Sequence, residues 1–517
     1  MSGYGTIERD LRLLLQGECS FDDATRTQYS TAACWYKIRP VGVVFPRNSE
    51  DVQNTARFCY ENGIPLIARG AGTGLAGQAV GMGIVVDFTR HMANLVTVNA
   101  ETVDIQPGIV LGELNKSLLP HRRMFPVDPA SGSLCSVGGM ISTNASGGHG
   151  VKYGSTKDHV EQLTVVLSNG ELATLSTPVQ ETTNKHSAVL DKIRAEMEPL
   201  LRKNKELILQ GFPRVAKNSC GYNLLDAVKT EPIDLRKIIV GSEGTLALVV
   251  GATLHTAEIP PFKIGALAYF RNYESTADAT LMGLQSKPSA VEILDHTYFT
   301  MAKGKDDGLL LDEAAAILYF EFEGHSVEAL LGDVDRLRSD LSACQLLDFR
   351  ILRTDEDRQK LWSLREEVSR MMNFDKTFGK TSFVEDVAVP ILNLPAFIDG
   401  LRSILQQYNI RFSIYGHAGT GNVHCGTFVD LKNLDHYKNI DAIATDVSSL
   451  AISLGGTLSG EHGDGFIRTP FLERLYGPEL YGIFKRVKDI FDPRAILNPG
   501  KIIGPQNTSI LHDIDFA

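Results

Sequence analysis

The stretch IPLIARGAGTGLAGQ, residues 64–78, decides the fold prediction. An apolar run ends at Arg69 and opens into four glycines within eight residues. We interpret it as a buried strand followed by a phosphate-binding loop, because backbone N–H groups close around a diphosphate only where no Cβ blocks their approach. Ordinary turns are glycine-rich too, so a structural turn stays open. A Rossmann fingerprint is disfavoured, because GIVVDF, residues 83–88, follows as a second strand instead of a long helix.

A second glycine-rich stretch, PVDPASGSLCSVGGMISTNASGGHGVKYGSTKDHV, occupies residues 126–160 and has more small residues than a packed core would use. Together the two stretches resemble the FAD-binding domain of the vanillyl-alcohol oxidase (PCMH) type, in which an extended FAD lies across two α/β subdomains. Within that superfamily the chain is most similar to the D-2-hydroxyacid dehydrogenases that act on D-lactate, glycolate or D-2-hydroxyglutarate. The resemblance covers roughly residues 40–501.

Composition narrows the class of protein. A chain of 517 residues exceeds what one hydrophobic core usually serves, so two or more domains are expected. The net charge of −11 argues against nucleic acid or an anionic membrane surface as a partner. Seven cysteines without a CxxC pair indicate reduced thiols in a cytoplasmic protein, not an iron–sulfur framework. No apolar run approaches about eighteen residues, so we expect a soluble protein without signal peptide or membrane span.

The predicted fold class is α+β, with the following domains. Residues 1–38 form an N-terminal helical segment, 39–258 a PCMH-type FAD-binding domain of two subdomains, and 259–430 an α+β substrate (cap) domain. Residues 431–505 complete the active site and return to the flavin, and 506–517 form a frayed tail. The Glu258-Ile259-Pro260-Pro261 sequence marks the domain boundary.

The expected elements of the first domain are a strand at 39–46, a helix capped by Ser49 and stopped at Gly63, a strand at 94–106 and a helix at 111–119. A hairpin with an Asn-Gly turn follows at 162–175, then a charged surface helix at 187–209 and strand character at 236–253. In the second domain we expect strands at 265–270 and 317–322 and helices at 275–285 and 327–343. A last helix is expected at 472–491, in the C-terminal segment.

The densest polar constellation lies in FSIYGHAGTGNVHCGTFV, residues 412–429. Pairing Ala418 with Gly421 would put His417 opposite Asn422 and leave His424 one diagonal step away on the same face. The loop SGEHGDG, residues 459–465, could add a carboxylate. Two histidines and a glutamate are a common catalytic zinc set, although histidines on a hairpin are often only packed or solvated.

The family resemblance implies that His417, His424 and Glu461 bind a divalent metal, with zinc the first candidate, and that His462 is the general base. Thr420 departs from the pattern, because many relatives have Asp between the two glycines. Local hydrogen bonding is therefore open at this turn.

The segment LWSLREEVSRMM, residues 361–372, has an apolar stripe bordered by Arg365. An arginine beside a core face can extend to solvent. The resemblance instead implies that Arg365 grips the substrate carboxylate through two parallel charge-assisted bonds. It also makes Ser369, one turn on, a substrate contact. Lys380 is a further substrate candidate, with a solvated lysine as the alternative.

The FAD contacts implied by the resemblance lie in the two glycine stretches, near residue 243 and at the C-terminal end, and those in the last two places could equally be structural. They are Arg69, Gly70, Ala71, Gly72, Thr73, Gly74, Gly77, Gln78, Pro129, Ser133, Val137, Gly138, Gly139, Thr143, Asn144, Gly147, Gly241, Glu243, Gly244, Asn498 and Lys501. Covalent members attach FAD through a histidine in the first loop, and Gly72-Thr73-Gly74 offers no nucleophile, so the FAD is expected to be noncovalent.

These features predict a FAD-dependent, metal-assisted dehydrogenase that oxidises a D-2-hydroxyacid to the 2-oxoacid. Electrons would pass to a separate iron–sulfur protein, electron-transferring flavoprotein or quinone/cytochrome system, through which peripheral membrane attachment is an option. An oxygen-using flavin oxidase and a non-catalytic flavin subunit are the alternatives. The substrate, the metal and the oligomeric state stay open, with a homodimer among the options.

Overall fold

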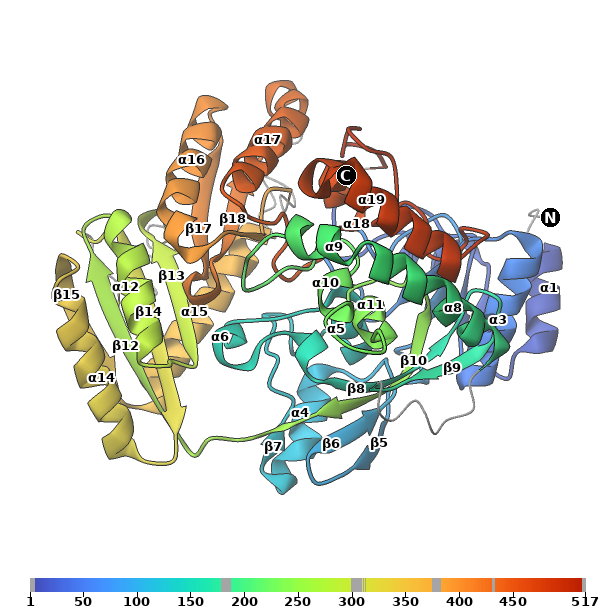
Figure 1. The fold of residues 1–517 in the computed structure, drawn as a ribbon, viewed down its shortest axis with the longest axis horizontal. Helices are drawn as coiled ribbons and strands as arrows, with labels where there is room; N and C mark the ends of the chain where they lie inside the picture. Colours follow the sequence, from blue (N-terminus) through green and yellow to red (C-terminus); the bar gives the residue numbers. More distant parts are fainter. Residues whose placement is uncertain are drawn as a thin grey trace.

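The computed structural model describes residues 5–177, 187–298, 309, 311, 313–373, 383–429 and 433–513, apart from the side chains of residues 365–373, 434 and 435. Three principal sheets form its framework, two in the first half of the chain and one in the second (Figure 1). The sheet of the second half stands apart at the left of Figure 1, with the two others at the centre and right. The fold class is α+β, as predicted.

The first sheet carries the glycine loop between two parallel strands. In spatial order its strands are β1 (Glu18–Ser20), β2 (Gly42–Phe45), β4 (Ile84–Asp87) and β3 (Leu66–Arg69). β3 and β4 pair in parallel, and the segment between them contains no helix. The loop is therefore not the start of a Rossmann helix, in agreement with the sequence.

Helix α3 (Ser49–Asn62) connects β2 to β3 and ends as predicted at Gly63, which has a φ of 65°. The predicted N-cap is wrong by one residue. The cap is Asn48, whose extended backbone lets its side chain accept the N–H of Asp51. Helix α1 (Gly5–Leu14) packs on α3, and α2 (Asp23–Gln28) precedes β2.

The second sheet is antiparallel, in the order β5 (Leu95–Val98), β6 (Thr102–Ile105), β10 (Leu248–His255), β8 (Val160–Val166) and β9 (Leu172–Leu175). The β8–β9 hairpin confirms the prediction for residues 162–175, and Gly170 takes the positive φ of its turn. The single strand expected at 94–106 is wrong, because a turn in which Asn99 N–H donates to Thr102 O divides it into β5 and β6.

The strand character expected at 236–253 is also partly wrong. Residues 235–239 form helix α11 (Leu235–Ile239), capped by the Asp234 side chain, which accepts the N–H of Arg236. Only β10 is a strand there. The remaining short elements of this half are α4 (Leu111–Leu118), β7 (Arg123–Met124), α5 (Val137–Thr143), α6 (Gly150–Tyr153), α10 (Leu224–Ala227) and β11 (Ala257–Glu258).

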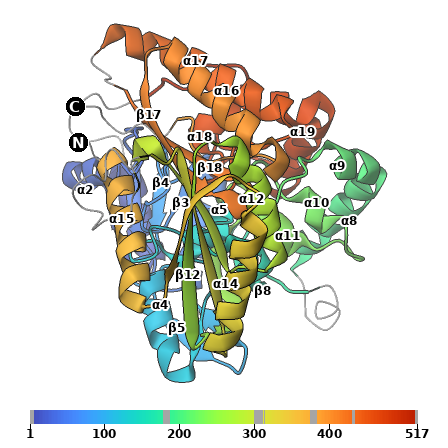
Figure 2. The same cartoon turned by 90° about the vertical axis from the view of Figure 1, so that its left-hand side faces the viewer.

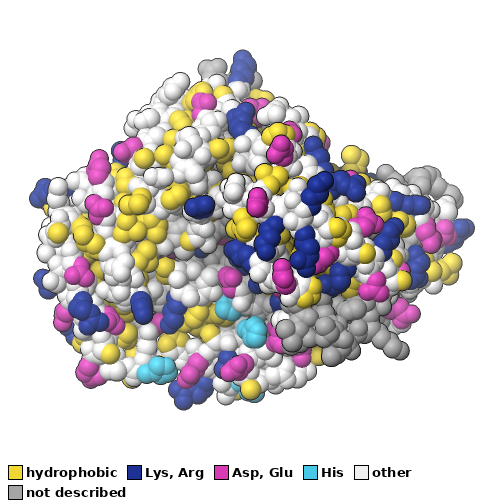
Figure 3. Space-filling view, viewed as in Figure 1, with side chains coloured by type: hydrophobic (Ala, Val, Ile, Leu, Met, Phe, Trp, Pro, Cys, Tyr) yellow, Lys and Arg dark blue, Asp and Glu magenta, His cyan; other side chains and the backbone are white. Residues whose placement is uncertain are grey.

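The charged segment at 187–209 forms α8 (Ala188–Lys203), capped by Ser187, and α9 (Lys205–Gly211). One face of α8 is buried and packs against the C-terminal helix α19 (Leu472–Phe491). Lys and Arg side chains, mixed with acidic ones, cover the outside of this region (Figure 3). The segment is a surface element with a buried side, as an amphipathic helix requires.

The cap sheet is antiparallel, in the order β15 (Leu346–Leu352), β12 (Phe262–Phe270), β14 (Ala316–Gly324), β13 (Ala290–Asp295), β17 (Arg411–His417), β18 (Asn422–Phe428) and β16 (Val387–Ala388). Helices α12 (Glu274–Gln285) and α14 (Val327–Leu341) cover one face, and α15 (Asp355–Asn373) covers the other (Figure 2). Alternate residues divide accordingly: Leu267 and Tyr319 pack with α15, whereas Ala268 and Phe320 face α12 and α14.

The C-terminal part links the two halves. Helices α16 (Leu394–Gln407) and α17 (Leu434–Ser453) pack together above the cap sheet (Figure 1), and α18 (Gly465–Arg468) leads into α19. After α19 the chain returns to the first sheet, where Asn498 N–H donates to Leu66 O. The expected frayed tail is wrong as far as residue 513: Ile510 is fully buried and its carbonyl accepts the Tyr36 hydroxyl at 3.0 Å.

No helix among the described residues is long and apolar enough to cross a membrane. All seven cysteines lie in this part of the chain, are buried, and form no disulfide.

Candidate active site

A cavity of about 470 Å³ lies where the two glycine stretches meet the cap hairpin. The predicted FAD contacts that line it are Arg69, Gly70, Ala71, Gly72, Thr73, Gly74, Gln78, Pro129, Ser133, Gly138, Gly139, Thr143 and Glu243. His417, His424, Glu461 and His462 line the same cavity. The predicted metal and base residues therefore line the same cavity as most of the predicted FAD contacts.

The two glycine stretches touch directly. A Cβ on Gly70 would lie 2.0 Å from the Ser136 hydroxyl, so only glycine permits this approach. The Arg69 guanidinium does not lie free in the cavity, because it donates to the carbonyl oxygens of Thr31 and Ala79. Arg69 holds the loop in shape and leaves the backbone N–H groups to meet a ligand.

Gln78 gives an observation that fits a bound cofactor. It lines the cavity, and its buried Oε1 has no hydrogen-bond partner among the described residues. Its Nε2 donates to the His462 carbonyl at 2.7 Å. Since a buried acceptor without a donor is costly, an N–H of a bound group such as the flavin ring suits this position. The residues of the cavity therefore fit FAD.

The other predicted FAD contacts, Gly77, Val137, Asn144, Gly147, Gly241, Gly244, Asn498 and Lys501, do not line the cavity. Two of them brace the first loop from behind. Asn498 Nδ2 donates to the carbonyls of Gln78 and Glu243, and Lys501 Nζ donates to Val80 O. Burial lowers the pKa of Lys501 to about 7.

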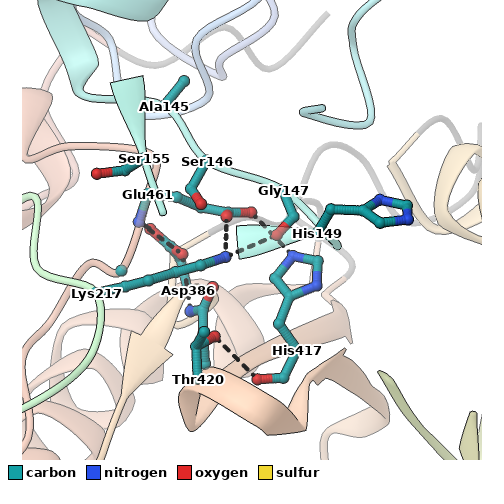
Figure 4. A network of polar contacts seen from close by, with 12 residues as sticks. Ala145, Ser146, Gly147, His149, Ser155, Lys217, Asp386, His417, Thr420 and Glu461 are labelled. Carbon is teal, nitrogen blue, oxygen red and sulfur yellow. Dashed lines mark hydrogen bonds and ion pairs between the residues drawn. The ribbon is translucent and has the colours of Figure 1, made fainter. Parts of the chain in front are cut away.

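The β17–β18 hairpin has the predicted register, with His417 opposite Asn422 and His424 opposite Tyr415. Both imidazoles point to the same carboxylate: Glu461 Oε1 lies 3.2 Å from His417 Nε2 and 3.3 Å from His424 Nε2. All three side chains are buried. Thr420 donates its hydroxyl to the His417 carbonyl at 3.1 Å and tightens the turn (Figure 4).

Carboxylates hold the far sides of these rings. Glu292 Oε1 lies 2.5 Å from His417 Nδ1, and Glu385 Oε2 lies 3.4 Å from His424 Nδ1. Metal-binding histidines commonly donate their second ring N–H to a carboxylate, which leaves Nε2 to face the ion. The donor set and its supports fit a divalent metal such as zinc.

A different donor set, Asp386, His424, Glu461 and His462, has ligand atoms within 4.8 Å of one another and does not include His417. Asp386 is already engaged, because its carboxylate accepts the backbone N–H groups of Glu461 and His462 and the Ser459 hydroxyl. We therefore assign Asp386 to shaping the 459–462 loop and not to ligating an ion.

His462 Nδ1 lies 2.9 Å from Glu385 Oε1, and its Nε2 lies 3.7 Å from Glu461 Oε1. Burial alone would lower the pKa of His462, but the charges of Asp386 and Glu385 outweigh it and raise the pKa to about 10. A dication ligated by Glu461 would oppose this rise. Burial would raise the pKa of Glu385, yet His462, His424 and Arg468 hold it well below its usual range.

Helix α15 buries the predicted stripe as far as the structure describes it: Leu361 and Leu364 are 4% and 5% exposed. The side chains of Arg365 and Ser369 lie outside the described residues, although both positions are on α15. Lys380 lies outside the described residues altogether. Of the predicted substrate contacts, the structure therefore places only Arg365 and Ser369, and only by their backbone positions on α15.

A second polar cluster joins the FAD-binding half to the cap. His149 Nδ1 lies 2.5 Å from Asp128 Oδ2, and its Nε2 lies 2.8 Å from Glu321 Oε1. Trp362 of α15 stacks on the His149 ring and donates its Nε1–H to Glu321. Lys263 Nζ also pairs with Glu321, at 3.1 Å. This cluster holds the middle of α15 against the second glycine stretch.

Sequence reasoning missed the supporting residues Lys217, Glu292, Glu385, Asp386 and His149. A signal existed for three of them. Glu385 and Asp386 interrupt the apolar run FVEDVAVP, and Glu292 interrupts AVEILD, so each is a charge within a segment that reads as buried. Lys217 and His149 have no such signal.

Comparisons with known proteins identify one family in each half of the chain. The FAD binding domain family matches residues 40–176, and the family described as FAD linked oxidases, C-terminal domain, matches residues 259–502. A D-2-hydroxyglutarate dehydrogenase of Escherichia coli (strain K12) is 29% identical over 95% of this chain, which spans 51% of that protein. A mitochondrial protein of Danio rerio, named probable D-lactate dehydrogenase, is 30% identical over 94% of this chain and 88% of its own length.

Among solved structures, 4-ethylphenol oxidase from Gulosibacter chungangensis in complex with isoeugenol superposes with a TM-score of 0.71 over 98% of both chains, at 15% identity. The superposition shows a shared fold, and at this low identity it shows the fold alone. The chain spans about half the length of the first bacterial relative, so the activity of that longer protein does not transfer by similarity alone.

Proposed function

The chain belongs to the FAD-linked D-2-hydroxyacid dehydrogenases of the vanillyl-alcohol oxidase superfamily, and on that premise we propose that it oxidises a D-2-hydroxyacid to the 2-oxoacid. The observation that carries the proposal is that one cavity is lined by both groups of residues. The glycine loops and the His417, His424 and Glu461 set line one space, so a bound flavin and a metal-held substrate would share it.

When bound, FAD supplies the acceptor for the hydride from carbon 2, and a divalent metal, zinc in our proposal, supplies a Lewis acid for the 2-hydroxyl. His417, His424 and Glu461 would hold that metal, with the Nδ1 atoms of the histidines fixed by Glu292 and Glu385. The buried position of these groups excludes water and strengthens their field.

His462 takes the hydroxyl proton in this proposal. Glu385 accepts from Nδ1, so Nε2 is the ring atom left to face the cavity. Gln78 bonds the backbone carbonyl of His462, and Asp386 accepts its N–H, so the base sits on a fixed backbone beside the flavin loop. A base fixed in this way needs no rearrangement when the proton moves.

Arg365 would grip the substrate carboxylate, with Ser369 and Lys380 as further contacts. The support is the position of Arg365 one turn after Trp362, on a helix held against both halves of the protein. A planar guanidinium matches a carboxylate by two parallel bonds.

The substrate is D-lactate, D-2-hydroxyglutarate or glycolate, and the electrons pass to a separate redox protein or quinone system. An oxygen-using oxidase is the second candidate function, and it would show rapid flavin reoxidation in air. A non-catalytic flavin subunit is disfavoured, because His417, His424, Glu461 and His462 are all present around the cavity.

Anaerobic bleaching of the flavin tests the proposal. The purified protein is mixed without oxygen with the D and L forms of lactate and 2-hydroxyglutarate and with glycolate, and absorbance of the oxidised flavin is followed. At least one 2-hydroxyacid should bleach it at a catalytic rate, with the D form preferred where the two forms exist. A flavin that stays oxidised with all of them would refute the function.

A further inference from the structure

Lys217 is a buried cation that the function proposed above does not use. It lies in the segment between α9 and α10, and its side chain is 2% exposed. Its Nζ lies 2.8 Å from Glu461 Oε2 and 3.0 Å from Gly147 O (Figure 4). A lysine is almost never this deeply buried unless its ammonium is paired, so the contact is specific.

The two oxygens of Glu461 have different partners. Oε1 faces the Nε2 atoms of His417 and His424. Oε2 faces Lys217 (Figure 4). The lysine therefore fixes the rotation of the carboxylate. Without it the carboxylate could turn and present either oxygen, or both, to the histidines.

The backbone at Gly150 also leaves room for the Lys217 side chain. A Cβ on Gly150 would lie 2.7 Å from Lys217 Cε, so the side chain crosses a space that exists only because residue 150 is glycine. The three contacting segments come from the second glycine stretch, the α9–α10 connection and the 459–462 loop. Lys217 thus connects the second glycine stretch, at Gly147, to the carboxylate of Glu461.

We propose that Lys217 is a positioning residue that holds Glu461 Oε2, so that Glu461 presents Oε1 alone to the metal bound by His417 and His424. The inference rests on the proposed function, because it concerns the same metal site. A lysine that merely stood in place of the metal would act in the opposite direction, since its positive charge would repel a dication and its removal would tighten metal binding.

The test measures metal affinity and not activity alone. Lys217→Met removes the ammonium, and Lys217→Gln keeps a hydrogen-bond donor without charge. Lys263→Met is the matched control, because Lys263 also pairs with glutamates but does so within the cap sheet, in the His149 cluster. The Zn²⁺ affinity of each FAD-loaded protein is measured by competition with a chromophoric chelator, together with FAD content and thermal stability.

Lys217→Met should weaken Zn²⁺ binding by about ten- to a hundred-fold, the usual effect of losing a residue that orients a ligand, and Lys217→Gln should weaken it less. Lys263→Met should leave the affinity unchanged. FAD content should stay at the wild-type level in all three variants.

Unchanged or tighter Zn²⁺ binding in Lys217→Met would overturn the inference. Loss of FAD and of stability in both Lys217 variants would also overturn it, by making the residue a structural link. These results differ from a failure of the proposed function, in which the wild-type protein itself would bind no divalent ion and oxidise no 2-hydroxyacid.

Discussion

Replacing His149 by glutamine should loosen the contact between the FAD-binding half and the cap, and it should do so more at about pH 6 than at about pH 10. His149 contacts a carboxylate on each side, Asp128 and Glu321. Burial alone would lower the pKa of His149, but the two carboxylates outweigh it and raise the pKa from 6.5 to about 10. The imidazolium is therefore the form that the folded protein stabilises.

A rise of this size corresponds to about 5 kcal/mol at most. The Asp128 side chain is 40% exposed, so solvent screens that part of the field. The Glu321 side chain is 2% exposed, and breaking such a buried pair costs about 3 to 5 kcal/mol when no other cation remains. Because Lys263 still pairs with Glu321, we expect a loss of about 2 to 3 kcal/mol.

The pH dependence follows from the direction of the two pKa shifts. Because the pKa of His149 is raised in the folded protein, its protonated ring stabilises the fold fully below about pH 6.5. This contribution is lost as the pH rises to about 10. Glu321 has a lowered pKa, because His149 and Lys263 outweigh its burial, so its contribution is lost as the pH falls below 4.5. The difference between wild type and variant should be largest between these limits.

Tryptophan fluorescence gives a local assay, because the chain has only two tryptophans. In a Trp35→Phe background, Trp362 alone reports on the cluster, where its ring stacks on His149 at 5.7 Å. Urea titrations of this protein with and without His149→Gln are compared across the pH range. Arg202→Gln is the control, since its pairs with Glu198 and Glu231 lie on the surface and are worth at most about 1 kcal/mol. If His149→Gln lowers the free energy of unfolding equally at about pH 6 and at about pH 10, the argument is refuted.

Four further outcomes are expected. Acid precipitation should release intact FAD into the supernatant, because the loop of residues 69–78 has no attachment residue, and yellow colour kept by the precipitate would contradict this. Chelation, or Glu461→Gln, should abolish flavin reduction by substrate while FAD stays bound, and full activity of metal-free protein would exclude a metal-assisted step. Arg365→Lys should weaken substrate binding by about 1 to 3 kcal/mol in a flavin titration, since the two-pronged fork is lost. His462→Ala should slow flavin reduction by about a hundred- to ten-thousand-fold in stopped flow with little change in substrate binding, and wild-type rates would remove His462 from the reaction.

The local elements of the site were readable from the sequence, because each depends on neighbouring residues. The glycine loop between two strands, the hairpin at 162–175 and the register that puts His417 opposite Asn422 are consequences of short-range patterns. Errors arose where a cap or a turn competed with strand propensity. Asp234 started a helix, and the turn at Asn99 divided a strand.

Only the tertiary structure decided which distant groups support the site. Lys217 reaches Glu461 across 244 positions, and His149 reaches Glu321 across 172. Neither contact has a periodicity or spacing in the sequence, because each arises when separate domains pack together. The sequence by itself determined the loops and the histidine pair, since backbone geometry and strand register are local. The charged residues that orient those groups act strongly only when they are buried. They become buried only when the two halves of the chain pack together.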